Sequence, residues 1–88
     1  MRKFKRLFNE YKRLNSITNE IEAAWDNDPE NEELEADFDK AYIAEHKALT
    51  NLMDYIVIYT GGMIDRPTAR LMIVKMPERL EALVNRIA

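Results

Sequence analysis

The sequence predicts an all-α fold: two long helices form an antiparallel hairpin, and a C-terminal helical arm follows, kinked or broken at Pro77. Apolar residues recur every three or four positions along most of the 88 residues, which is the spacing of helices with one buried face. Asp, Pro and Gly residues typical of helix ends divide this pattern, and the connections are short. We expect one domain over residues 1–88, a three- to four-helix bundle that homodimerisation could complete.

The first helix is expected over residues 3–25. Its apolar positions alternate by three and four, as in the seam between two packed helices. These positions are Phe4, Leu7, Tyr11, Leu14, Thr18, Ile21 and Trp25. Thr18 is the one member without a hydrophobic side chain. The segment Asp26–Pro29 has the composition of a turn, so the next helix should return antiparallel to the first.

The second helix is expected over residues 30–60, a rod of about 46 Å. Asp28 is the predicted N-cap and Pro29 the predicted first helical residue. Gly61 and Gly62 should end the helix, because Gly readily takes the left-handed conformation found there. One alternative stays open: Tyr55–Tyr59 and Leu71–Val74 are rich in strand-forming residues and could pair as a β-hairpin across the glycines.

An antiparallel hairpin with this turn places opposite each other the positions whose numbers add to about 58–60. Facing pairs would be Leu7 with Leu52, Tyr11 with Ala48 or Leu49, and Phe4 with Ile56. The same register would bring Arg13 beside Glu45. We expect an ion pair between them that fixes the register.

The C-terminal arm is expected to begin after the glycines, with Met63 and Ile64 packed into the core. Asp65 is the predicted N-cap of a helix over residues 66–76, and a further helix should cover 78–87. Pro77 interrupts the two because it lacks an N–H and its ring clashes with the preceding turn. The inward residues would be Ala69, Met72, Ile73, Met76, Leu80, Leu83, Val84 and Ile87.

The charge is distributed unevenly along the chain. Residues 1–13 hold six basic and one acidic side chains, residues 14–45 one basic and eleven acidic, and residues 46–88 six basic and four acidic. The corresponding net charges are +5, −10 and +2. In the predicted hairpin, the basic and acidic groups gather at opposite ends of the molecule.

Composition excludes several classes of function. The chain has no Cys, which removes disulfides and thiolate metal sites and fits a cytoplasmic location. No apolar run approaches the length of a membrane span, and the basic start lacks the apolar core of a signal peptide. We expect no cofactor and no enzymatic activity, because phosphate-loop and dinucleotide motifs are missing, and a single His and a single Ser offer little for a catalytic triad.

The acidic segment around Asp26 is not a calcium loop. A twelve-residue loop starting there would need Gly at its sixth position and Glu at its twelfth, but these positions hold Asn31 and Asp37. His46 also lacks the Glu three positions earlier that di-metal helical bundles use, because residue 43 is Ile. We therefore expect a solvated acidic tip, a structural His46 and no bound metal.

The candidate interaction surface is basic. It consists of Arg2, Lys5, Arg6, Lys12 and Arg13, opposite the apolar stripe of the first helix, with Arg66 and Arg70 as an extension from the arm. Positive charge at a helix N-terminus opposes the helix dipole, so this placement costs local stability. The surface could bind an acidic protein, nucleic-acid phosphates or an anionic membrane. It could also serve solubility alone, or pair with the acidic tips of neighbouring chains.

The function expected from these features is that of a non-catalytic helical interaction protein, of adaptor or inhibitor type, with an unidentified protein partner and self-association into a dimer. The alternative is a nucleic-acid-associated accessory protein that uses the basic surface. The net charge of −3 argues against sequence-specific DNA recognition, because DNA-binding domains are usually basic.

Overall fold

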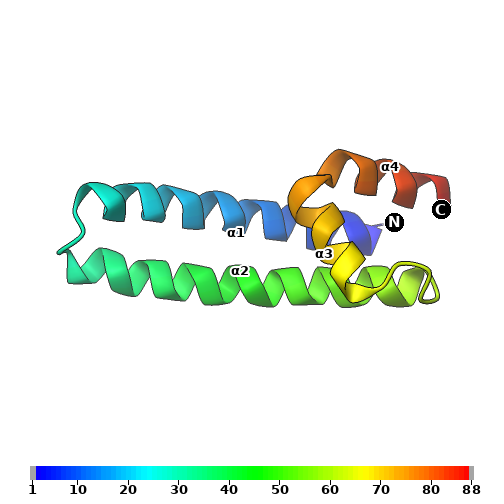
Figure 1. Cartoon of the computed structure of the whole chain (residues 1–88), viewed down its shortest axis with the longest axis horizontal. Helices are drawn as coiled ribbons and strands as arrows, with labels where there is room; N and C mark the ends of the chain where they lie inside the picture. Colours follow the sequence, from blue (N-terminus) through cyan, green and yellow to red (C-terminus); the bar gives the residue numbers. More distant parts are fainter. Residues whose placement is uncertain (1, 88) are drawn as a thin grey trace.

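The protein is an antiparallel helical hairpin with a two-helix arm folded over one end (Figure 1). The computed structural model describes residues 2–87, the last by its backbone alone. The helices are α1 (Arg2–Asn27), α2 (Glu32–Tyr59), α3 (Arg66–Lys75) and α4 (Pro77–Ile87). No strand occurs within residues 2–87, so Tyr55–Tyr59 and Leu71–Val74 are helical and the β-hairpin alternative is wrong. The principal extents are 47 × 21 × 18 Å.

The N-cap of α2 is Asn31, and the prediction of Asp28 was wrong. The Asn31 side chain accepts hydrogen bonds from the backbone N–H groups of Glu33 and Leu34, at 3.0 and 3.2 Å. Asp28 supports this cap, since the Asn31 amide donates to its carboxylate at 3.1 Å. Because α1 continues to Asn27, the chain needs Asp28 to Glu30 for the reversal itself. Pro29 therefore lies in the turn and not in the helix.

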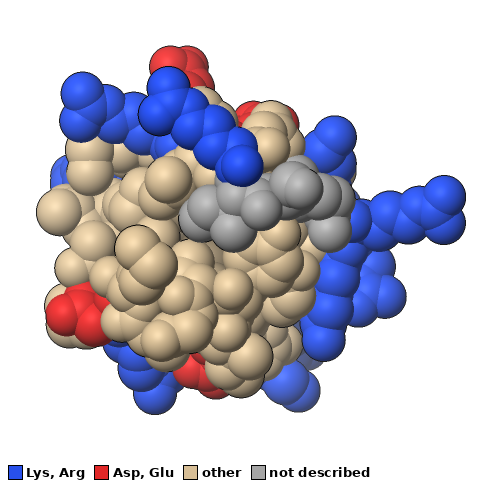
Figure 2. Space-filling view, turned by 90° about the vertical axis from the view of Figure 1, so that its right-hand side faces the viewer, with Lys and Arg blue, Asp and Glu red and all other residues tan. Residues whose placement is uncertain are grey.

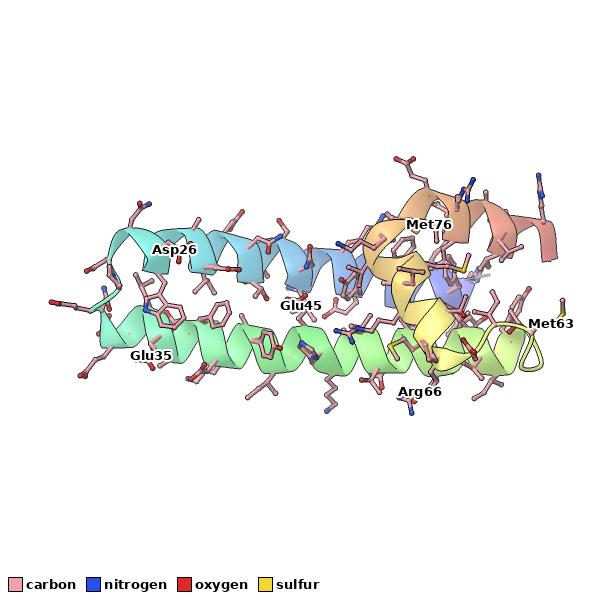
Figure 3. All side chains as sticks on the ribbon, in the orientation of Figure 1. Asp26, Glu35, Glu45, Met63, Arg66 and Met76 are labelled. Carbon is pink, nitrogen blue, oxygen red and sulfur yellow. The ribbon has the colours of Figure 1, made fainter. Side chains whose placement is uncertain are left out.

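The C-terminus of α2 follows the prediction. Gly61 and Gly62 have φ values of 63° and 86°, and their N–H groups donate to Ile58 and Val57 as in a Schellman motif. The Thr60 hydroxyl then accepts a hydrogen bond from the Ile64 N–H at 3.2 Å, which turns the chain back toward the hairpin. Ile64 is buried as expected, but Met63 is 89% exposed, because the short reversal leaves it at the tip of the loop (Figure 3).

The start of α3 also follows the prediction. Asp65 caps it by accepting the Thr68 N–H at 2.9 Å, and its interactions with the side chain and backbone of Thr68 hold the pKa of Asp65 below its usual value. Helix α3 ends at Lys75, and Met76 leaves the helical conformation with φ −136° and ψ 53°. Helix α4 begins at Pro77, so the arm consists of two short helices.

The register of the hairpin agrees with the predicted sum of positions. Asn15 of α1 donates to Glu45 of α2 at 2.9 Å, and the Lys3 ammonium lies 5.7 Å from the centre of the Tyr55 ring. The predicted pair of Arg13 with Glu45 is wrong, because Arg13 binds Glu10 one turn earlier. Arg13 lies on the edge of the seam that Ala44 and Lys47 line, whereas Asn15 lies on the edge that carries Glu45.

The core lies under the arm and does not extend along the whole hairpin. Its buried residues come from all four helices and the loop before α3: Phe4, Phe8, Tyr11, Ala48, Leu49, Leu52, Ile56, Ile64, Ala69, Ile73, Leu80 and Val84. In the other part of the hairpin, from residue 12 to residue 47, Thr18 alone is buried. We call this part the open half, because α3 and α4 do not cover it (Figure 1).

The inward positions predicted for the arm are mostly confirmed. Ala69, Ile73, Leu80 and Val84 are buried, and Met72, Met76 and Leu83 are half-buried. The side chain of Ile87 lies outside the described part of the chain.

Candidate interaction surfaces

The five basic residues predicted on α1 are all exposed. They are Arg2, Lys5, Arg6, Lys12 and Arg13. Arg13 binds both carboxylate oxygens of Glu10, at 2.6 and 3.1 Å, and this holds the pKa of Glu10 below its usual value. Lys12 lies 4.7 Å from the centre of the Phe8 ring. Arg2 and Arg6 line an open depression together with Lys3, so cations are concentrated at the N-terminal end of α1.

The two arginines predicted to extend this surface from α3 lie elsewhere. Arg66 pairs with Asp54 of α2 at 3.3 Å and points to the side of α2 that faces away from α1 (Figure 3). Arg70 lies near Tyr11, where its charge opposes the rise in the pKa of Tyr11 caused by burial and by Glu45. The seven residues therefore do not form one continuous patch. Seen end on, the basic side chains stand around a centre of uncharged residues (Figure 2).

The open half carries a row of aromatic rings that were not among the predicted surface residues. Adjacent ring centres in the series Trp25, Phe38, Tyr42 and His46 are 5.3, 5.8 and 4.2 Å apart. Tyr42 is exposed, the other three are half-buried, and Ile43 beside them is 67% exposed. We call these four residues the aromatic row. The signal was present as the spacing of four between Phe38, Tyr42 and His46.

The outward side of α3 is also apolar. Leu71 and Val74 are 51% and 46% exposed, and with Pro67 they line an open depression flanked by Arg70 and Lys75. We call these five residues the outer face of α3. The apolar stripe predicted for α3 faces inward, and Leu71 and Val74, which are out of phase with it, were not among the predicted surface residues.

The aromatic row and α3 lie on the same side of the hairpin. Tyr42 and Met53 are eleven residues apart, about three turns, and so share one side of α2. Met53 packs against the core to which Ala69 and Ile73 of α3 belong. Helix α3 therefore crosses the hairpin at the end of the side along which the aromatic row runs (Figure 1).

The tip of the open half is acidic. Asp26 and Glu35 lie there and are exposed, at the end opposite Met63 (Figure 3). Within residues 2–87, no group of three or more His, Asp or Glu side chains is placed to hold a metal ion. His46 is half-buried against the Tyr42 ring.

None of the described helices combines the length and the apolar character needed to cross a membrane. No protein-family model, curated protein or solved structure matches the chain.

Proposed function

We propose that the protein is a non-catalytic helical interaction protein, of adaptor or inhibitor type, and that the open half is its contact surface. The observation that carries this proposal is the incomplete cover of the hairpin: between residues 12 and 47 only Thr18 is buried. Helical hairpins normally bury their apolar stripe against a further layer. Here that layer ends at α3 (Figure 1), and beyond it Tyr42 of the aromatic row is exposed while the other three members stay half-buried.

The chemistry of the aromatic row supports this proposal. Aromatic side chains are enriched in the centres of protein interfaces, because they bury a large area while losing little conformational freedom. Tyr42 and Ile43 are already exposed, so a partner would gain apolar contact without unfolding the hairpin. The acidic side chains around the row would favour a partner with a basic rim. A cytoplasmic location is part of the proposal, and the Cys-free composition supports it.

The second candidate is a nucleic-acid-associated accessory protein that uses the basic residues of α1. The observation that favours it is the exposure of these cations and the shared depression of Arg2, Lys3 and Arg6. Cations that neutralise phosphates release counterions, so such binding should weaken steeply as salt increases. The net charge of −10 on residues 14–45 would limit it to contacts made end on.

Affinity capture with three variants separates the two candidates. Tyr42→Ser with Ile43→Ser alters the open half, Lys5→Glu with Arg6→Glu alters the basic end, and Ile58→Ser is the matched control. Ile58 is 79% exposed and lies outside the open half, so it undergoes the same chemical change without touching the proposed surface. Circular dichroism checks that each variant remains helical.

The proposed function predicts that one protein is captured in near-equal amount and that nuclease does not release it. Its capture should be lost with the Tyr42–Ile43 variant and kept with the other two variants. Capture that disappears on nuclease treatment and with the Lys5–Arg6 variant would favour the nucleic-acid candidate. Capture that is equally strong with all variants would refute the assignment of the open half.

A further inference from the structure

We propose that the open half is covered by a second copy of this chain, packed antiparallel, with the outer face of α3 of each copy on the aromatic row of the other. This inference rests on the proposed function, because it names the occupant of the same surface. Three observations support it. Two apolar surfaces are exposed, both lie on one side of the hairpin, and the charges around them are of opposite sign.

The two apolar surfaces are suited to each other by symmetry. A two-fold dimer is isologous: if one surface of the first copy contacts a different surface of the second copy, the same contact occurs again with the two copies exchanged. The aromatic row and the outer face of α3 follow one another along one side of the molecule, since α3 packs over the part of α2 that comes directly after the row. A two-fold axis that is perpendicular to this side and passes between the two surfaces brings each row opposite the α3 of the other copy.

The charges favour the antiparallel arrangement over a parallel one. Residues 14–45 carry a net charge of −10, whereas residues 1–13 and 46–88 carry +5 and +2. A parallel dimer would place the two acidic halves together, and an antiparallel dimer places each acidic half beside a basic one.

The same complementarity occurs at the proposed contact. Arg70 and Lys75 flank the exposed apolar residues of α3. On α2, Glu35 and Asp39 precede Tyr42 by seven and three residues, so both acids lie on the side of the helix that carries the row. Basic side chains from one copy would then meet acidic side chains from the other at both symmetric contacts.

The molecule is large enough for a stable dimer interface. Such an interface buries about 800 Å² per partner, and the two longest extents of the molecule are 47 and 21 Å. A chain of this length buries only about 60–65% of its unfolded surface by itself, so a second copy would add stability that a small core lacks.

The test is the oligomeric state of the purified full chain, measured by sedimentation across a wide range of concentrations. The wild type should dimerise. Leu71→Glu should weaken the dimer by at least about tenfold, because it places an acid opposite the acidic flank of the row. Ile58→Glu is the matched control: it introduces the same charge at an exposed Ile outside the interface and should leave the dissociation constant unchanged. A monomeric wild type, or equal weakening by the control, would overturn the proposal.

Charge reversal tests the antiparallel arrangement itself. One variant carries Arg70→Glu and Lys75→Glu, and the other carries Glu35→Lys and Asp39→Lys. Each alone should dimerise weakly, because like charges meet at both contacts. A mixture should recover a heterodimer, because both contacts then join opposite charges. Failure of the mixture to exceed the two separate variants would overturn the arrangement.

Cross-linking gives an independent readout, because the chain contains no Cys. Tyr42→Cys and Leu71→Cys, joined by a short bismaleimide, should link to each other and not to themselves. Self-linking of Tyr42→Cys would indicate a parallel dimer and refute the proposal. If the wild type is a monomer and still captures a protein through Tyr42 and Ile43, the dimer is wrong and the proposed function stands. If a dimer forms and no other protein is captured, self-association is the only contact of the open half that is supported.

Discussion

The hydrogen bond from Asn15 to Glu45 is the one side-chain hydrogen bond that joins α1 to α2 among the described residues. It spans 2.9 Å, and both side chains are half-buried. A hydrogen bond to a charged acceptor contributes about 1.5–3 kcal/mol, and competing water reduces this at a partly exposed site. We therefore expect a coupling of about 1 kcal/mol, equal to a change of about 4–8 °C in melting temperature for a domain of this size.

A double-mutant cycle measures this coupling without the effect of changed helix propensity. Asn15→Ala, Glu45→Ala and the double variant are compared by urea unfolding at one protein concentration, so that self-association stays constant. A parallel cycle uses Arg13→Ala with Glu45→Ala. The structure predicts a coupling in the first cycle and none in the second, because Arg13 binds Glu10 and lies on the other edge of the seam from Glu45. Glu45→Gln should keep part of the coupling, since its amide oxygen can still accept from Asn15.

The reverse result would refute the register of the hairpin at this point. A coupling between Arg13 and Glu45, with none between Asn15 and Glu45, would mean that α1 is rotated about its axis relative to the structure. A coupling in neither cycle would mean that water replaces the Asn15 hydrogen bond at no cost.

Three further predictions concern the cap, the seam and the alkaline limit of stability. Asn31→Ala should destabilise the protein by about 1 kcal/mol in urea unfolding, and Asp28→Ala by less, because Asn31 alone accepts the free N–H groups of α2; the opposite order would restore Asp28 as the cap. Thr18→Val should be neutral or stabilising by up to about 1 kcal/mol, because the Thr18 hydroxyl donates only to the Leu14 carbonyl of its own helix; a loss greater than this would assign the hydroxyl another role. Burial, and then the charge of Glu45, raise the pKa of Tyr11 above its usual 10.0, so the stability that neutral Tyr11 contributes is complete below that pH and is lost as pH rises through the folded-state value. Tyr11→Phe should therefore lose less stability than wild type between neutral pH and about pH 10.5 in urea unfolding, and an equal loss in both proteins would contradict this role of Tyr11.

Features set by residues close together in the sequence were predictable. The Schellman motif at Gly61 and Gly62 and the Asp65 cap each depend on a few consecutive residues whose conformational preferences agree. The hairpin register followed from the apolar stripes, because both long helices can bury them only in one phase. These features determine where the helices lie in the sequence and how α1 packs against α2.

Features decided by competition between similar groups were not predictable. Asp28 and Asn31 are comparable caps, and the choice depended on how far α1 continues before the turn. Arg13 and Asn15 are both near Leu14 in sequence, and only the rotation of α1 decides which of them reaches Glu45. The candidate surface shows the same limit: exposure of the basic residues on α1 follows from phase, whereas the direction of Arg66 depends on the loop before α3.

Pro77 links the sequence of the arm to the surface that remains open on the hairpin. An unbroken helix from Arg66 to Ile87 would be about 33 Å long and could lie along most of a 47 Å molecule. The break at Met76 instead gives two helices of about 15 and 17 Å. Helix α3 crosses the hairpin, and α4 then runs toward the end where α1 begins, away from the acidic tip (Figure 1). The proline was recognisable in the sequence, but the direction of the chain after it depends on how Leu80 and Val84 reach the core. The open half, and therefore the proposed contact surface, is a consequence of that direction, which no local pattern specifies.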